Sequence, residues 1–394
     1  HNRQRDNNDE TVASTGEPVL SDDMMQNNNK QSLIGEVAYS KTFLNSSFSA
    51  GYKGTFAHSG ATIHNFLTGT GTYDYGVHTD RHYLYAEYVS QNQSFMYRLS
   101  LGETIDHSSN DEACYTKYLF NPQAEVGYTI NGNNQIRLMI DCEPVEPTLS
   151  DLSDNMVLIT DNIILKGNPL LKSGNDYGAG LVYKLTDQYI DMGIAGALDY
   201  TRNPINSYYC KENIDGKDYI VNTSENANSL LEYGGVVDFL LRPLKSNVFT
   251  VKVTASALLD RISSPIIGHY RHWYTPVEYS IDYRKGCWGA SYEGNIVSRK
   301  INGSNLESDE NESHLQVFWQ KNNLRLFAKC FWIFSKSKYS GETIPNDILH
   351  YDFHTHINDN CSMLTVGLSW NFSKGKNRKI ERSIKNKDTD KGTF

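Results

Sequence analysis

Just before a lysine-rich C-terminal tail, the sequence reads Cys361-Ser-Met-Leu-Thr-Val-Gly-Leu-Ser-Trp-Asn-Phe372, and this segment decides how the rest is interpreted. Its large apolar residues occupy every second position from Leu364 to Phe372, with small or polar residues between them. Because side chains of a strand alternate between its two faces, the pattern predicts a strand with one apolar face. About ten residues is also the length that a tilted strand needs to cross a membrane.

Similar segments recur along the whole chain, and they predict an all-β antiparallel transmembrane β-barrel with about 14–16 strands in this chain. We expect strands near residues 33–42, 46–56, 81–90, 94–105, 117–129, 134–143, 176–186, 188–201, 228–242, 247–260, 271–285, 287–300, 312–321, 324–335 and 360–372.

The composition fits a barrel, although 39% hydrophobic residues and a mean hydropathy of -0.54 are also typical of soluble proteins. No run approaches the ~20 apolar residues of a membrane helix, whereas a barrel strand turns only alternate residues to lipid. The 26 tyrosines, 15 phenylalanines and 5 tryptophans would form aromatic girdles at the two water interfaces. The alternative is a large soluble all-β protein.

The lengths of the connections argue against that alternative. Short connections such as 131–133 and 322–323 are rich in Asn and Gly, which suit tight hairpins. They alternate with long polar excursions such as 57–80, 144–175 and 202–227. Outer-membrane barrels have short periplasmic turns and long extracellular loops, and a soluble barrel has no reason to sort its loops in this way.

This sorting predicts three regions. Residues 1–32 form a polar extracellular loop or disordered segment, residues 33–372 form the barrel, and residues 373–394 form a basic periplasmic tail with eight Lys or Arg against three acids. Bacterial single-chain barrels have an even number of strands, whereas about fifteen are expected here. Either one strand is missed, or the chain is part of a larger barrel of about 22 strands.

Several segments carry a resemblance. Residues 81–90 and 97–104 look like paired strands in the C-terminal barrel of TonB-dependent-receptor-like proteins of Bacteroidota. Pro147-Thr-Leu-Ser-Asp-Leu152, followed by Gly167-Asn-Pro-Leu-Leu-Lys172, is similar to a motif pair of that family. The chain departs from the family pattern at two places. Residues 141–146 are acidic where the family has arginines, and Ser173-Gly174 stands where the family has Pro-Glu.

The resemblance implies an outer-membrane transport barrel that takes up a nutrient across the bacterial outer membrane. Its partners would be outer-membrane lipids and lipopolysaccharide, an upstream plug domain, the TonB energy-coupling protein, and a surface lipoprotein or other outer-membrane subunits. The alternative is a plugless accessory or scaffold barrel subunit, or a passive pore, in a larger outer-membrane complex. Neither hypothesis involves nucleic acid.

Pro147, Gly167, Asn168 and Pro169 are interpreted as a structural motif rather than a binding site. Gly and Asn tolerate left-handed backbone angles, and Pro fixes φ, so together they predict a rigid corner in the long loop.

Catalytic motifs are absent from the sequence, and neither an enzyme activity nor a cofactor is predicted. His350, Asp352, His354 and His356 are weak candidates for a metal site, because alternate residues of an extended segment share one face. Solvated loop histidines are the more common case. The acidic remainder of the chain would favour cations or neutral solutes over anions in the lumen.

The six cysteines show no C-x-x-C spacing, so no zinc or redox motif is predicted. A disulfide between Cys114 and Cys142 is conceivable on the extracellular side, but the pairing depends on a distance that sequence does not give.

Overall fold

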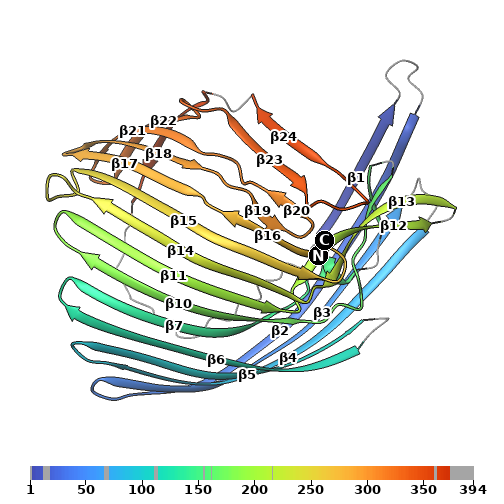
Figure 1. Ribbon diagram of the computed structural model, residues 1–394, viewed down its shortest axis with the longest axis horizontal. Coiled ribbons are helices and arrows are strands. Elements are labelled where there is room, and N and C mark those ends of the chain that lie inside the picture. The colour runs from blue at the N-terminus through green and yellow to red at the C-terminus, as the bar shows by residue number, and fades with distance from the viewer. Residues whose placement is uncertain are drawn as a thin grey trace.

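The computed structural model describes residues 2–11, 18–65, 71–110, 114–153, 156–160, 162–214, 216–358 and 362–372. Most of them form strands, arranged in one 17-stranded sheet and two four-stranded sheets. The large sheet curls into the wall of a barrel (Figure 1). Within these ranges, no helix has the length and apolar character needed to cross a membrane.

The predicted fold class is confirmed, with 17 wall strands among the described residues where about 14–16 were expected, and fifteen of them overlap the fifteen predicted segments. These strands are β2 (Pro18–Thr42), β3 (Ser46–Asn65), β4 (Gly71–Gln91), β5 (Phe95–Asn110), β6 (Cys114–Asn131), β7 (Asn134–Val145), β10 (Gly174–Thr186), β11 (Ile190–Arg202), β14 (Ser229–Leu241), β15 (Phe249–Ser264), β17 (Val277–Lys285), β18 (Trp288–Ile296), β21 (Ser313–Lys321), β22 (Leu324–Phe331) and β25 (Leu364–Trp370). The remaining two are β1 (Asn2–Thr11) and β16 (Gly268–Tyr274). β16 pairs with residues 258–264 of β15, and β17 pairs with residues 249–255 of the same strand.

The start of the chain differs from the expected polar loop. β1 pairs with the first part of β2, from Asn2 opposite Asn28 onward, and both segments are extended. Main-chain hydrogen bonds can pair two strands whatever the polarity of their side chains, so the polar composition did not reveal this hairpin. In the same way, β3 and β4 extend into residues 57–80, which we expected to form a loop. The basic tail, residues 373–394, lies outside the described residues.

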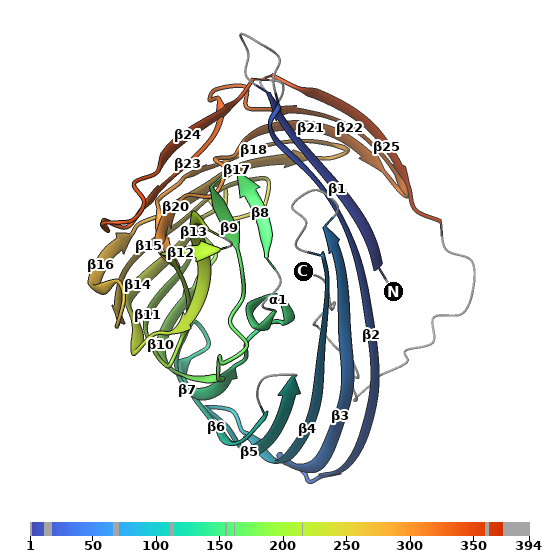
Figure 2. The same ribbon diagram turned by 90° about the vertical axis from the view of Figure 1, so that its right-hand side faces the viewer.

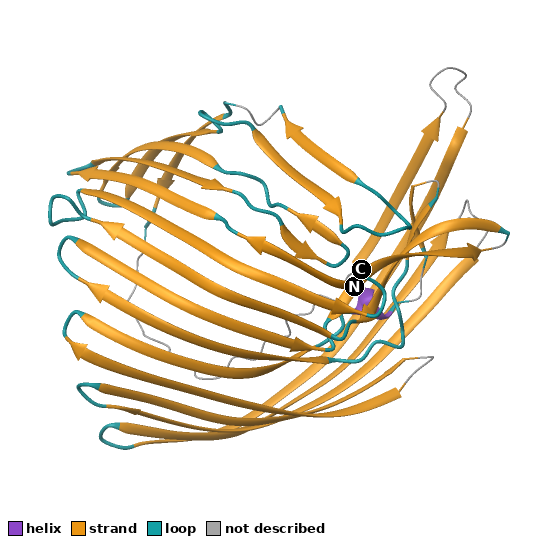
Figure 3. Cartoon of the chain, viewed as in Figure 1, coloured by secondary structure: helices purple, strands orange, loops and turns teal. Residues whose placement is uncertain are grey.

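Short turns gather at one end of the wall, and the longer connections lie at the other (Figure 3). Asn322 and Gly286 adopt positive φ, 53° and 60°, in two of these turns. Asn92 caps another, where its side-chain oxygen accepts from the amide of Ser94 at 2.9 Å. These are the tight hairpins that the Asn- and Gly-rich connections predict.

The outer face of the wall is apolar. Alternate residues of each strand are large, hydrophobic and exposed, up to 74% for Val37 and Val366. Further examples on other strands are Tyr52, Leu84, Leu99, Tyr128, Leu138, Leu181, Ile194, Val237, Ile281, Val317 and Leu326. So large an exposed apolar surface is typical of a membrane-spanning band and untypical of a soluble monomer.

A small inner sheet fills part of the ring at the end with long connections (Figure 2). It consists of β8 (Val157–Thr160), β9 (Ile163–Leu165), β12 (Ile205–Ile214) and β13 (Lys217–Asn226), preceded by the short helix α1 (Leu149–Leu152). Leu152 and Leu171 are buried with Val77 of β4, and Ile205 packs on them. Residues 144–175 and 202–227, which were expected to form loops, therefore build a folded unit. We call this unit the insertion.

The second small sheet comprises β19 (Lys300–Asn302), β20 (Asn305–Glu307), β23 (Ser337–Thr343) and β24 (Asp352–Ile357). It touches the inner sheet, since the Ser304 hydroxyl donates to the carbonyl of Ser207 at 2.7 Å.

The wall has two free edges in the described part of the chain. β25 pairs with β22 alone, and β2 from Asn29 to Thr42 pairs with β3 alone. No pairing joins β25 to β1 or β2 among the described residues, and the ring is open along this line. We call this line the seam.

Candidate functional site: a luminal groove

The luminal face of the wall carries the polar residues of the strands. Some opposite charges on this face pair across neighbouring strands: Arg98 with Glu87 at 2.7 Å, and Arg137 with Glu125 at 3.1 Å. A polar lumen inside an apolar outer face is the arrangement of a transmembrane barrel.

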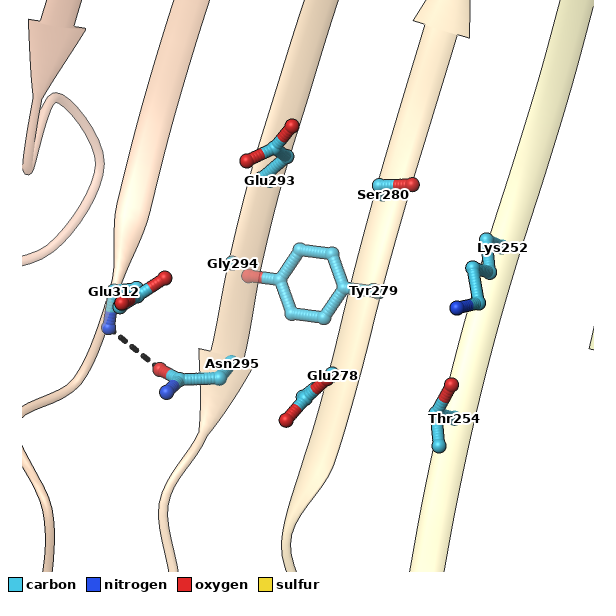
Figure 4. Close-up of a pocket in the computed structure, with 9 residues that line it drawn as sticks. All are labelled: Lys252, Thr254, Glu278, Tyr279, Ser280, Glu293, Gly294, Asn295 and Glu312. Carbon is cyan, nitrogen blue, oxygen red and sulfur yellow. Dashed lines mark hydrogen bonds between the residues drawn. The ribbon is translucent and has the colours of Figure 1, made fainter. Parts of the chain in front are cut away.

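A groove of about 330 Å³ lies on this face, across β15, β17, β18 and the segment before β21 (Figure 4). Strand register builds it from two rows. Lys252, Ser280 and Glu293 lie side by side, and Thr254, Glu278 and Asn295 form the neighbouring row. The lining residues are Lys252, Thr254, Glu278, Tyr279, Ser280, Glu293, Gly294, Asn295 and Glu312.

Contacts on either side hold the groove in place. Asp238 accepts from the Thr254 hydroxyl at 2.6 Å and lies 3.5 Å from the Lys252 ammonium group. On the other side, the side-chain oxygen of Asn295 accepts from the Glu312 amide at 2.5 Å. Thus the only lysine of the groove already has a carboxylate partner.

Between these supports, Glu278 and Glu293 have no ion-pair partner among the described residues. Their carboxylates lie on two adjacent strands and face the same lumen. A groove with two unpaired carboxylates and neutral hydroxyl and amide groups can hold a positively charged or polyhydroxylated solute. The Thr254 and Ser280 hydroxyls are oriented by Asp238 and Asp282, so the polar groups of the groove are held in place for binding.

Sequence reasoning did not single out these groove residues. A signal was present, because Glu278, Ser280 and Asp282 alternate with the outward Ile281 and Tyr283. Alternation identifies the luminal face of one strand, but the register with β15 and β18 comes only from the structure.

A second pocket of about 370 Å³ lies between the two small sheets. Tyr208, Tyr209 and Ile266 line one part of it, and the segment from Ile344 to Ile348 lines another. Its lining contains more aromatic and aliphatic residues than the charged luminal groove, and it lies at the end with long connections.

The predicted structural motif lies in the insertion. Pro147 precedes Thr148, which exchanges hydrogen bonds with Asp151 at the start of α1: the Thr148 amide donates at 2.9 Å, and the Asp151 amide donates back at 3.3 Å. Gly167 and Asn168 contact α1 and β13. Neither residue is among those with positive φ, so the expected left-handed backbone is not the reason for glycine here. A Cβ on Gly167 would lie 2.3 Å from the Ser153 carbonyl oxygen, so close approach is the reason.

The weak metal candidates lie at and near β24. Asp352, His354 and His356 share one exposed face, and His354 Nε2 lies 3.6 Å from Asp352 Oδ1. His350 precedes the strand and is also exposed. Among the described residues, no group of three His, Cys, Asp or Glu is close enough to hold a metal ion.

Cys114 and Cys142 are free thiols, so the conceivable disulfide between them is not formed. Cys142 is buried and Cys114 is exposed. The Cys114 sulfur instead lies 3.9 Å from His107 Nε2.

No family model matches the sequence, and no curated protein matches it either. Solved structures do match. The copper transporter OprC has 10% identity and a TM-score of 0.64, over 89% of this chain and 61% of OprC. The FrpB iron transporter from Neisseria meningitidis (F5-1 variant) has 10% identity and a TM-score of 0.51, over 93% of this chain and 68% of FrpB.

The ferric enterobactin receptor PfeA from Pseudomonas aeruginosa has 12% identity and a TM-score of 0.53, over 85% of this chain and 53% of PfeA. This chain thus spans about three fifths of the length of OprC. Identities this low establish the fold and nothing finer. The chain has the fold of the barrel of a TonB-dependent outer-membrane transporter.

Proposed function

We propose that this chain forms the wall, the loops and the solute-binding groove of an outer-membrane transporter that admits a nutrient, in the manner of TonB-dependent receptors. One observation carries the proposal: the wall strands turn apolar residues outward and polar residues inward to a groove. The likeness to barrels described as copper and iron transporters supports transport in general. The nutrient is not carried over from them.

The proposal includes a location in the bacterial outer membrane, with lipids and lipopolysaccharide around the apolar band. It also includes a plug domain, the TonB energy-coupling protein and a surface lipoprotein as partners. Solved structures of similar fold include a complex of FpvAI with pyocin S2 and one of HasR with its hemophore HasA and heme. Origin from receptor-like proteins of Bacteroidota stays a prediction that rests on the sequence motifs near Gly167.

Reconstitution tests this function. The purified protein, refolded into liposomes, should resist extraction by carbonate and should run at a different position on a gel when it is not boiled. Solutes trapped with it should exchange across the bilayer only when the protein, with its partners, forms a complete pathway. A protein that stays soluble without detergent and never inserts would contradict the proposal.

A second candidate function is favoured by the seam. Free edges at β2 and β25 suit a scaffold or accessory subunit that joins strands of another chain, because unpaired main-chain groups are costly in lipid. Cross-linking from cysteines placed at Val37 and Leu368 in native membranes would distinguish the two functions. Cross-links to a different polypeptide support the accessory role, and cross-links within a single polypeptide support the receptor.

A further inference from the structure

Strand register brings acidic residues from separate strands into one transverse row of the lumen. Asp141 of β7 lies opposite Gly178, and Gly178 lies opposite Asp199 of β11. Asp199 lies opposite Glu232 of β14. Glu232 in turn lies opposite Asp260 of β15, so the row crosses five consecutive wall strands. We call Asp141, Asp199, Glu232 and Asp260 the acidic row.

Gly178 keeps the row continuous. A Cβ at this glycine would lie 2.9 Å from either carboxylate oxygen of Asp141, so the Asp141 side chain lies over the glycine backbone. The missing side chain lets the Asp141 carboxylate extend toward Asp199, and the two are electrostatic neighbours. Asp176, two residues before Gly178 on β10, adds another carboxylate beside Asp199.

The row faces the lumen. On the same strands, residues of the opposite phase are exposed on the outer face: Ile140 at 49%, Leu198 at 47% and Val237 at 44%. Because side chains alternate between the two faces of a strand, Asp141, Asp199 and the remaining members point inward.

Ion pairs are missing from the row among the described residues, although strand register places His272 of β16 opposite Asp260. In the described part of the chain, Asp141, Asp199, Glu232 and Asp260 form no ion pair with Lys, Arg or His, although elsewhere in the lumen Arg98 and Arg137 do pair with acids. Lys117 is the nearby lysine, and its ammonium group donates instead to the carbonyl oxygens of Ser173 and Gly174.

Among the four residues of the row, Asp260 gives the clearest evidence for a ligand. It is only 5% exposed, and its buried Oδ1 has no hydrogen-bond partner in the described part of the chain. Strand register places it directly opposite Glu232, and the two carboxyl groups are electrostatic neighbours. Like charges on directly opposite residues of two strands repel, so a proton or a cation between these carboxyl groups is favourable. A buried oxygen with no partner is costly unless a donor arrives to satisfy it.

The spacing of the row favours an extended cation over a single metal ion. Neighbouring strands are about 4.8 Å apart, so Asp199 and Asp260 are separated by roughly two such steps. Among the described residues no three carboxylate, His or Cys groups converge as a metal site requires. We propose that the acidic row binds an organic solute carrying two or more ammonium or guanidinium groups along its length.

This inference rests on the proposed function and names its substrate class. Glu278 and Glu293 of the luminal groove lie nearer the short-turn end of the same wall, because Thr254 is opposite Glu278 and six residues before Asp260 on β15. A cationic solute that leaves the row would therefore meet a second pair of free carboxylates on its way down the lumen.

Isothermal titration calorimetry with spermidine tests the proposal on the native protein in detergent, where membrane insertion plays no part. We expect spermidine to bind, and a D199N/E232Q variant to bind at least about tenfold more weakly, since each charge-assisted contact is worth about that factor. D309N is the matched control, because Asp309 is 71% exposed and outside the row. Its affinity should equal that of the unaltered protein.

Folding of D199N/E232Q is checked by its mobility on an unboiled gel and by circular dichroism, and relief of repulsion should leave both unchanged. Equal spermidine affinity in the folded double variant, or no spermidine binding at all, would overturn the proposal. Tight binding of Cu²⁺ or Zn²⁺ alone that depends on the row would overturn the organic-cation assignment. Failure to insert into liposomes would instead count against the proposed function and leave the calorimetric result standing.

Discussion

The side-chain amide of Asn168 donates a hydrogen bond to the carbonyl oxygen of Ser224 over 3.0 Å, and it ties the segment after α1 to the inner strand β13. The Asn168 amide nitrogen of the main chain donates to the Asp151 carbonyl at 2.6 Å. One residue thus joins α1 and β13, which belong to two different long connections.

Replacing Gly167 with Ala should loosen this insertion. The new Cβ would lie within 2.6 Å of the carbonyl oxygens of Ser153, Ser150 and Asp151, and main-chain atoms yield little. Overpacking of this kind costs about 1–3 kcal/mol. Hydrogen exchange of β9 and β13 should become faster, while the wall strands keep their protection. Gly132→Ala is the control, because nothing lies within 4 Å of the added Cβ, and unchanged exchange in Gly167→Ala would refute the prediction.

Arg81→Ala should destabilise β4 and β5 at their ends away from the short turn that joins them. Arg81 Nε lies 3.6 Å from Asp106 Oδ1, and its guanidinium group also pairs with Glu146. Asp106 is only 2% exposed, so losing Arg81 leaves a buried charge without its partner, at a cost of about 1–3 kcal/mol.

Arg98→Ala is the matched comparison, since Arg98 is 50% exposed and pairs with Glu87. That loss should cost under about 1 kcal/mol. Urea unfolding in detergent measures both variants, and equal costs would show that the burial of Asp106 is unimportant.

Glu225 should make the inner sheet sensitive to pH. Burial raises the pKa of this carboxyl group, and the hydrogen bond from the Ser264 hydroxyl offsets only part of that effect. A raised folded-state pKa means that the stabilising contribution is complete below the ordinary Glu pKa and is lost as pH rises through the folded-state value.

Protection of β12 and β13 from hydrogen exchange, corrected for the intrinsic rate, should therefore fall from acid to alkaline pH. Glu225→Gln should flatten this dependence, because glutamine does not titrate. A profile that stays the same in the variant would assign the pH dependence to another group.

Ile194→Arg should impair membrane insertion. Ile194 is outward and 44% exposed on β11, where a charge placed at mid-depth costs about 2–4 kcal/mol. Its neighbour Ala195 has the opposite phase and faces the lumen, so Ala195→Arg should insert far better. The folded fraction in liposomes, read from unboiled gels, compares the two, and equal loss in both would contradict the two-faced wall.

The wall could be predicted from sequence because period-two alternation and Asn-Gly turns are local signals. β25 shows this well, since Leu364, Val366 and Leu368 were expected outward and are exposed. The inner sheet could not be predicted, because β9 has only three residues and pairs in parallel with β13, more than fifty positions away.

The candidate site could not be predicted from the sequence for a related reason. In the sequence, Glu278 and Glu293 are ordinary polar residues of two alternating strand patterns. Only the register of β17 with β18 makes them neighbours. The acidic row needs four registers at once, together with the absence of a side chain at Gly178. Register over such distances is set by the whole sheet rather than by any one segment.

The seam constrains the order of events during biogenesis. Half of the main-chain groups along β25, and along β2 beyond Asn29, have no partner strand in the described part of the chain. Hydrocarbon does not solvate such groups, so insertion is favoured when strands docked against both edges enter the bilayer together with the wall. In the accessory role proposed above, a shortage of those partner strands would slow insertion and leave more of this wall waiting at the membrane surface.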